Sequence, residues 1–243
     1  MFGIIDIVMI LKNKVTGIEI GNANKFVKYE LDRGSDFTWV CFLPQRTTLV
    51  IAQKYHLLPK KGNLIVYEVP LNLIADDPNI TRKAFFSLVE DFESVYKGII
   101  DKENIAFAGI SVGSMPAIFI ANKYRSKKIR IICSTAKLGE GIFGAFAARG
   151  IKNKCIKNGF NEKSYDSVLN EINPIKNIVN LPEDIKIIIS KFDKYIPYAG
   201  GKKLAEEIRK NKKKAKVYKF YFYGHFLTMA KIGFLNKKCD FFK

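Results

Sequence analysis

Continuous apolar runs of strand length alternate with segments of helical period over most of this 243-residue chain. Residues 37–43 (FTWVCFL) are one such run, whereas residues 81–100 repeat their apolar side chains at the 3.6-residue spacing of one helix face. Strands that are apolar throughout are buried on both faces, as in a parallel sheet covered by helices. The sequence therefore predicts an α/β fold with a mostly parallel, doubly wound sheet. The predicted strands cover 37–43, 64–69, 104–108, 129–134, 185–190 and 217–223, and the predicted helices cover 47–58, 81–100, 114–124, 201–211 and 227–234.

The N-terminal part of the chain has a different pattern. Residues 16–20 and 26–31 alternate in character around a Gly-Asn-Ala-Asn turn, which predicts an antiparallel hairpin at one edge of the sheet. Residues 3–11 fit either a short helix or a strand.

A chain of this length fits one domain, so we expect residues 1–243 to fold as a single unit. The strand–helix alternation is interrupted over residues 139–184, which begin with small and apolar residues and continue as polar helical sequence. At this length the interruption predicts a small cap insertion rather than an independent domain.

Charge is strongly unbalanced, with 41 Lys and Arg against 23 Asp and Glu, a formal net charge of +18. A polyanionic partner such as nucleic acid or an anionic lipid surface is one interpretation. The other is that Lys, which supplies most of the charge, covers solvated faces; nucleic-acid readers depend more on Arg. We adopt the second interpretation and expect no specific nucleic-acid partner. The densest cluster, residues 209–214, ends a predicted helix and falls at the N-terminal edge of the sheet.

The apolar runs are well below the roughly 20 residues that a bilayer-spanning helix needs, so no transmembrane segment is predicted. The start of the chain lacks the pattern of a signal peptide, and we expect a cytoplasmic protein with reduced thiols. Cys41, Cys133, Cys155 and Cys239 lie far apart, with no CxxC pair and no His at ligand spacing. The sequence thus predicts neither a metal site nor a disulfide framework, and it has no motif for a cofactor.

One pentapeptide has the pattern of a catalytic turn. Gly109-Ile110-Ser111-Val112-Gly113 has the form G-x-S-x-G and lies where a predicted strand meets a helix rich in small residues. Such a turn places its central residue in a strained conformation, which requires very small residues two positions before and after it. A glycine-rich turn with an incidental serine is the alternative.

Two further polar residues follow predicted strands. Asp193 comes just after the strand 185–190, and His225 follows the strand 217–223. Because the C-terminal ends of parallel strands share one edge of the sheet, Ser111, Asp193 and His225 are expected to converge there, in the chain order Ser, Asp, His.

These three motifs resemble those of the α/β-hydrolase superfamily, and the similarity extends from about residue 16 to the C-terminus. The resemblance implies that Ser111 is the nucleophile and that His225 is a general base and then a general acid. It implies that Asp193 orients His225 and stabilises its cation. The expected substrate is a small-molecule carboxylic ester or thioester.

The sequence departs from the family pattern at the oxyanion hole. Many members carry His-Gly after the strand that precedes the first long helix, whereas this chain has Phe42-Leu43-Pro44-Gln45-Arg46. Because Pro44 has no N–H, the Gln45 amide is the first candidate for one donor and Arg46 the second. The amide of Val112 is the expected other donor. The second histidine, His56, is interpreted as a surface or packing residue.

Other functions stay open at this point. The same acyl-enzyme could be delivered to an alcohol or amine, which would make the protein an acyltransferase. A member without activity could use the fold as a binding module. Epoxide or haloalkane hydrolysis is not expected, because the family members with those activities place Asp where this chain has Ser111. The sequence does not indicate the oligomeric state.

Overall fold

Eight strands form one sheet in the order β1-β2-β4-β3-β5-β6-β7-β8. The computed structural model describes residues 15–20, 24–100, 104–124, 126–212, 214–239 and 241–243. Strands β3 to β8 are parallel to one another, and β2 joins the sheet antiparallel to β4. The strands are β1 (Val15–Ile20), β2 (Asn24–Leu31), β3 (Thr38–Phe42), β4 (Asn63–Glu68), β5 (Ile105–Ile110), β6 (Lys128–Ile132), β7 (Asp184–Ser190) and β8 (Lys216–Phe220).

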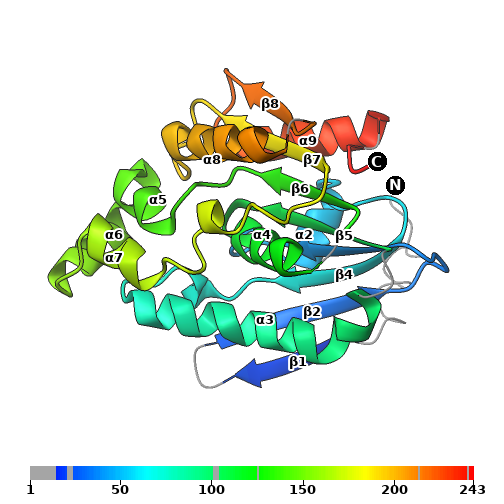
Figure 1. Cartoon of the computed structure of the whole chain (residues 1–243), viewed down its shortest axis with the longest axis horizontal. Coiled ribbons are helices and arrows are strands. Elements are labelled where there is room, and N and C mark those ends of the chain that lie inside the picture. Colours follow the sequence, from blue (N-terminus) through cyan, green and yellow to red (C-terminus); the bar gives the residue numbers. More distant parts are fainter. Residues whose placement is uncertain (1–14, 21–23, 101–103, 125, 213, 240) are drawn as a thin grey trace.

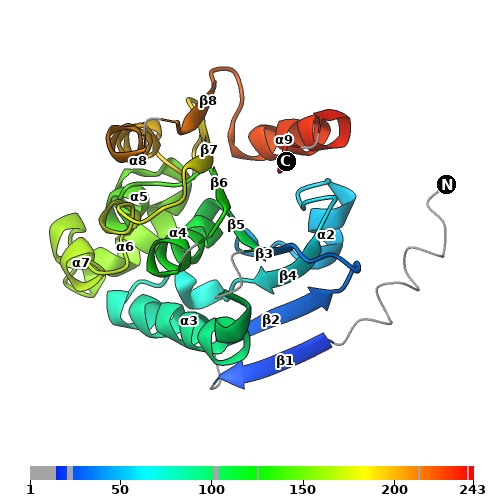
Figure 2. The ribbon, with the colours of Figure 1, turned by 45° about the vertical axis from the view of Figure 1, so that its right-hand side comes forward.

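Helices cover both faces of this sheet, as Figures 1 and 2 show. Helices α3 (Pro78–Ile100), α4 (Ser114–Lys123) and α8 (Tyr198–Asn211) lie on one face, and α2 (Leu49–Lys54) and α9 (His225–Cys239) lie on the other. Each face has its own apolar core, one containing Phe85 and Phe107 and the other containing Trp39 and Ile232. The doubly wound α/β architecture predicted from the apolar runs is confirmed.

The predicted N-terminal hairpin is also confirmed, because β1 pairs antiparallel with β2 at one edge of the sheet. The segment 3–11 lies outside the described residues.

Several predicted element boundaries differ from the observed ones, three of them near the C-terminal edge of the sheet or in the helix that follows β3. The helix expected over 47–58 spans only Leu49–Lys54: Thr48 caps its start by accepting from the Ile51 amide, and His56 has a left-handed backbone (φ 54°) just after its end. The strand expected over 217–223 ends at Phe220, because its partner β7 ends at Ser190, which is paired with Phe220. His225 is therefore the first residue of α9, which begins earlier than expected.

The interruption between β6 and β7 is helical. It contains α5 (Leu138–Gly144), α6 (Arg149–Lys157) and α7 (Glu162–Val168), with short 3-10 turns between and after them. Figure 1 shows α5, α6 and α7 at the end of the sheet toward which the parallel strands point. In the described residues, no helix has the length and apolar character needed to cross a membrane.

Arg130 anchors the opposite end of the sheet. Its side chain is completely buried in β6, and its two terminal nitrogens bind the carboxylate of Asp184 at 2.9 and 3.1 Å. The same guanidinium donates to the main-chain oxygens of Phe242 and Lys243, at 3.2 and 3.0 Å. A planar group with five donors can bind a carboxylate and main-chain oxygens together. Arg130 thus ties the end of the described chain to the start of β7.

Removing this guanidinium should destabilise the fold. Arg130→Met leaves buried main-chain oxygens without donors, so we expect the free energy of unfolding to fall by about 3 kcal/mol. Lys128→Gln is the matched control, because Lys128 is 3.9 Å from the same Asp184 but partly exposed; its effect should stay below about 1 kcal/mol. Urea unfolding measures both, and equal losses in the two variants would contradict the anchoring role.

Candidate active site

The turn Gly109–Gly113 joins the end of β5 to α4. Ser111 has φ 55°, in the left-handed region that side chains other than glycine seldom adopt. The Ser111 carbonyl accepts from the Ser114 hydroxyl at 2.5 Å, and that hydroxyl lies 2.6 Å from the Ser134 hydroxyl in the loop after β6. The strained turn predicted from the pentapeptide is thus present at Ser111, at the C-terminal edge of the sheet.

Both glycines of this turn are sites of close backbone approach. A Cβ atom at Gly109 would lie 2.4 Å from the Ser114 Cα atom. A Cβ at Gly113 would lie 2.4 Å from the Phe42 carbonyl oxygen and 2.7 Å from that of Leu43. The beginning of α4 therefore packs directly on the end of β3, and no side chain fits between them.

Asp193 and His225 form a hydrogen-bonded pair. The Asp193 Oδ2 atom lies 2.6 Å from His225 Nδ1, and the two side chains are 1% and 6% exposed. The other carboxylate oxygen, Oδ1, accepts from the amides of Tyr195 and Ile196 at 2.8 and 2.9 Å. Because an ionised carboxylate only accepts, Nδ1 carries a proton, and Nε2 is the nitrogen that can take up another. The convergence predicted for these two residues is present.

Cys133 also joins this pair, which reasoning from the sequence missed. It follows β6 with φ 51°, and its sulfur lies within 4.8 Å of ligand atoms of both Asp193 and His225. Burial raises the pKa of the Cys133 thiol, and the charge of Asp193 and a hydrogen bond to it raise the pKa further. Cys133 is therefore a neutral thiol beside the Asp193–His225 pair.

This trio also contains donor types that bind zinc. We interpret it as a hydrogen-bonded cluster, since Asp193 already binds the His225 ring directly. The spacing of the cysteines along the chain does not indicate this contact, because only the order β6-β7-β8 brings Cys133 to this cluster.

The loop after β3 holds the two oxyanion candidates. The Thr47 amide donates to Pro44 at 3.1 Å, which closes a tight turn with Arg46 at φ 62°. The Gln45 side-chain amide donates a hydrogen bond to the Leu71 carbonyl. The main-chain amide of Gln45 makes no hydrogen bond to another residue in the described part of the chain.

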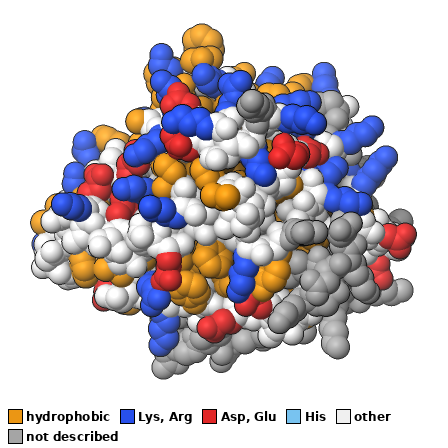
Figure 3. All heavy atoms as spheres, in the orientation of Figure 1, with side chains coloured by type: hydrophobic (Ala, Val, Ile, Leu, Met, Phe, Trp, Pro, Cys, Tyr) orange, Lys and Arg blue, Asp and Glu red, His pale blue; other side chains and the backbone are white. Residues whose placement is uncertain are grey.

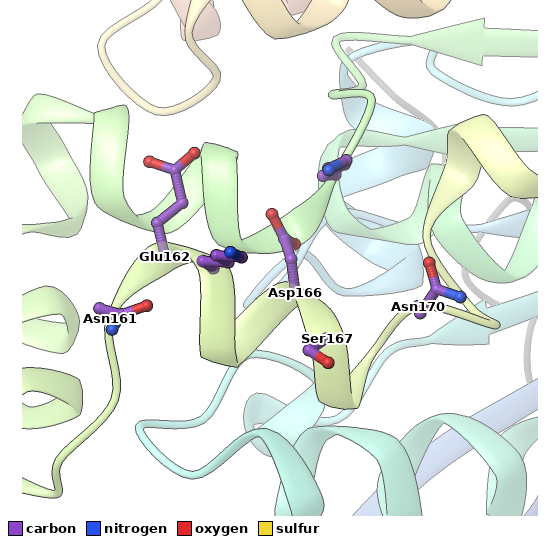
Figure 4. Close-up of a pocket in the computed structure, with 7 residues that line it drawn as sticks. Asn161, Glu162, Asp166, Ser167 and Asn170 are labelled. Atoms are coloured by element: carbon purple, nitrogen blue, oxygen red, sulfur yellow. The ribbon is translucent and has the colours of Figure 1, made fainter.

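A separate surface hollow lies over α7. It measures about 620 Å³ and is lined by Lys137, Asn161, Glu162, Lys163, Asp166, Ser167 and Asn170 (Figure 4). Asp166 is already engaged, because it accepts from the Gly139 amide at 2.7 Å. None of Ser111, Asp193 and His225 lines this hollow, and we assign no catalytic role to it.

Comparison with known proteins identifies the fold. No family model matches the sequence, and no curated protein is similar to it. Among solved structures, a carboxyl esterase from the fungus Tuber melanosporum has a TM-score of 0.62 and 13% identity, with 93% of this chain and 85% of the esterase covered.

Two further solved structures resemble this chain. An α/β-hydrolase-fold protein from Chitinophaga pinensis has a TM-score of 0.59 and 14% identity, with coverage of 95% and 97%. An acylaminoacyl peptidase from Pyrococcus horikoshii has a TM-score of 0.63 and 10% identity; 93% of this chain matches 41% of the peptidase. Similarity at this level of identity establishes the fold.

Because the main chain at Gly113 lies so close to the Phe42 and Leu43 carbonyls, a larger residue at this position should destabilise the fold. Gly113→Ala would place a methyl group against main-chain oxygens that cannot move aside, so unfolding should become easier by about 3 kcal/mol or more. The control is Gly150→Ala in α6, where a Cβ would meet nothing within 4 Å; this variant should be neutral or up to about 1 kcal/mol more stable. Thermal unfolding of both variants checks this, and a Gly113→Ala protein as stable as wild type would refute the packing described here.

Proposed function

Because the chain has the α/β-hydrolase fold, we propose that it is a serine hydrolase that cleaves a carboxylic ester or thioester through an acyl-enzyme on Ser111. The observation that carries this proposal is the buried pair of Asp193 and His225 at the same edge of the sheet as the left-handed Ser111. The similar esterase from Tuber melanosporum supports the class of reaction.

The proposed roles follow from the hydrogen bonds. Nδ1 of His225 is held by Asp193, so Nε2 accepts the Ser111 proton as the serine oxygen attacks the carbonyl carbon. Asp193 stays ionised and stabilises the imidazolium that forms. The proton then passes to the departing alcohol or thiol, and the acyl group remains on Ser111. Water attacks the acyl-enzyme in the same way, which releases the acid and restores the serine.

The proposed oxyanion hole consists of the main-chain amides of Val112 and Gln45. The contact of Gly113 with the carbonyls of Phe42 and Leu43 brings the turn after Ser111 beside the segment that leads to Gln45. Two N–H groups fixed by backbone packing need no reorganisation as charge develops on the substrate oxygen. The Gln45 amide, the first N–H after Pro44, is the proposed second donor, with that of Arg46 as the alternative.

Hydrolysis of p-nitrophenyl esters of graded chain length tests the proposal. Ser111→Ala removes the attacking oxygen and should lower kcat/KM by at least about 10³-fold, even if some catalysis by binding persists. Ser167→Ala, an exposed serine of α7, serves as the control and should stay within about twofold of wild type. Activity that survives in Ser111→Ala at the wild-type level would exclude the proposed nucleophile.

A further inference from the structure

Large hydrophobic side chains are exposed in the segments that flank Asp193 and His225 and in the segment of Phe146. Six of them, between 47% and 87% exposed, form what we call the aromatic rim: Phe146, Phe192, Tyr221, Phe222, Phe226 and Leu227. Figure 3 shows hydrophobic side chains standing out at the top of the view, above β8, with Lys and Arg side chains beside them. Burying such side chains is strongly favourable, so a cluster of them at a surface indicates a binding surface.

The rim is continuous with the candidate active site. The Tyr195 ring lies 5.1 Å from the His225 ring and 5.3 Å from the Phe226 ring, measured between centroids. The Lys194 carbonyl accepts from the Ala147 amide at 2.9 Å, which joins the segment of Phe146 to the loop after β7. Phe226 and the segment of Phe146 therefore adjoin the cluster that contains His225.

Cations are interleaved with these rings. The Lys191 ammonium lies 5.9 Å from the centroids of both Phe192 and Tyr221. Arg149 and Lys194 lie 4.0 and 5.8 Å from the Phe146 ring. These three cations form no ion pair with any acidic residue that the structure describes.

Acidic residues are scarce in the sequence around the rim. Asp193 is the only Asp or Glu between residues 185 and 205, and its carboxylate is bound to His225. Residues 208–239 contain no Asp or Glu. The rim thus presents apolar rings and unneutralised positive charge together, which complements a surface that is both anionic and apolar.

We propose that the aromatic rim is a docking surface for an anionic lipid bilayer. Aromatic rings insert at the boundary between headgroups and acyl chains, while Lys and Arg stay at the phosphate level. Each Lys or Arg near an anionic leaflet adds to binding. Single-stranded nucleic acid also stacks on aromatic side chains, but the aliphatic Leu227 and the prevalence of Lys over Arg favour lipid.

Docking in this orientation would place the candidate active site against the bilayer. If the proposed serine hydrolase activity holds, the substrate is an acyl ester or thioester that partitions into the membrane. Docking itself does not depend on that activity, so the two can be tested separately.

Vesicle flotation tests the docking surface. Wild type should bind vesicles of phosphatidylcholine with about 30% phosphatidylglycerol at least tenfold more tightly than pure phosphatidylcholine, at about 0.1 M salt. The double variant Phe192→Ser, Phe222→Ser should weaken binding about tenfold or more. Lys191→Gln with Lys194→Gln should weaken binding to the anionic vesicles about tenfold.

Matched variants on other surfaces provide the controls. Val95 and Val179 are 48% and 65% exposed, and their double change to Ser should leave vesicle binding within about twofold. The same holds for Lys210→Gln with Lys212→Gln, because Lys210 lies in the last turn of α8 and Lys212 follows that helix, before the start of β8 and so at the end of this strand opposite the rim. The Phe192, Phe222 variant should keep wild-type thermal stability, which excludes misfolding as the cause of weaker binding.

Ser111→Ala separates docking from catalysis, since it should bind vesicles as wild type does. Vesicle binding without any ester hydrolysis would refute the proposed activity and leave docking intact. Failure of wild type to bind anionic vesicles would overturn the docking proposal, and so would equal losses in rim and control variants. Binding to a single-stranded oligonucleotide that depends on Phe192 and Phe222, without vesicle binding, would also overturn it.

Discussion

The candidate site depends on the contact of main chain with main chain at the start of α4. Gly113 lies against the carbonyls of Phe42 and Leu43, and Gly109 lies against the Cα atom of Ser114. These two contacts pack the turn tightly against the ends of β5 and β3. They hold Ser111 in a left-handed conformation that an isolated turn would not adopt. The same packing brings the end of β3, and the loop with Gln45, beside the amide that follows Ser111. Main-chain packing at this edge of the sheet thus holds Ser111 in its strained conformation.

Hydrogen bonds fix the position of the buried Asp193 carboxylate. Two amides of the loop after β7 and the His225 ring at the start of α9 donate to it, and the buried Cys133 sulfur lies close by. Burying an anion costs free energy unless it is hydrogen-bonded, and here the donors that follow two adjacent strands, β7 and β8, meet that requirement. The imidazole is consequently oriented by an element that does not have to move during the proposed reaction.

Much of this arrangement could be predicted from the sequence, because its signals are local. Apolar runs predicted the parallel strands, and the two glycines around Ser111 predicted the strained turn. Asp193 and His225 could be placed at one edge because each follows an apolar run. The position of Cys133 could not be found in this way, since its contact with Asp193 depends on strand order rather than on spacing.

The boundaries of β8 and α9 were missed for a related reason. The aromatic sequence 217–223 favours a strand throughout, but pairing ends where β7 ends, at Ser190. Among the residues after Phe220 that the sequence pattern assigns to the strand, Tyr221 and Phe222 are exposed. A longer strand would have aligned them with the sheet. Their exposure underlies the proposed bilayer contact, which no sequence period indicates.

The most direct test of the central claim is the rate and position of covalent labelling by a fluorophosphonate. The probe forms a stable adduct only with a serine that is activated as a nucleophile. Peptide mapping should locate the adduct on Ser111 in wild type, and Asp193→Asn should slow the labelling by about 10³-fold or more because His225 then loses its orienting anion. An adduct on another serine, or an unchanged rate in Asp193→Asn, would contradict the assignment of Ser111, His225 and Asp193 as one catalytic unit.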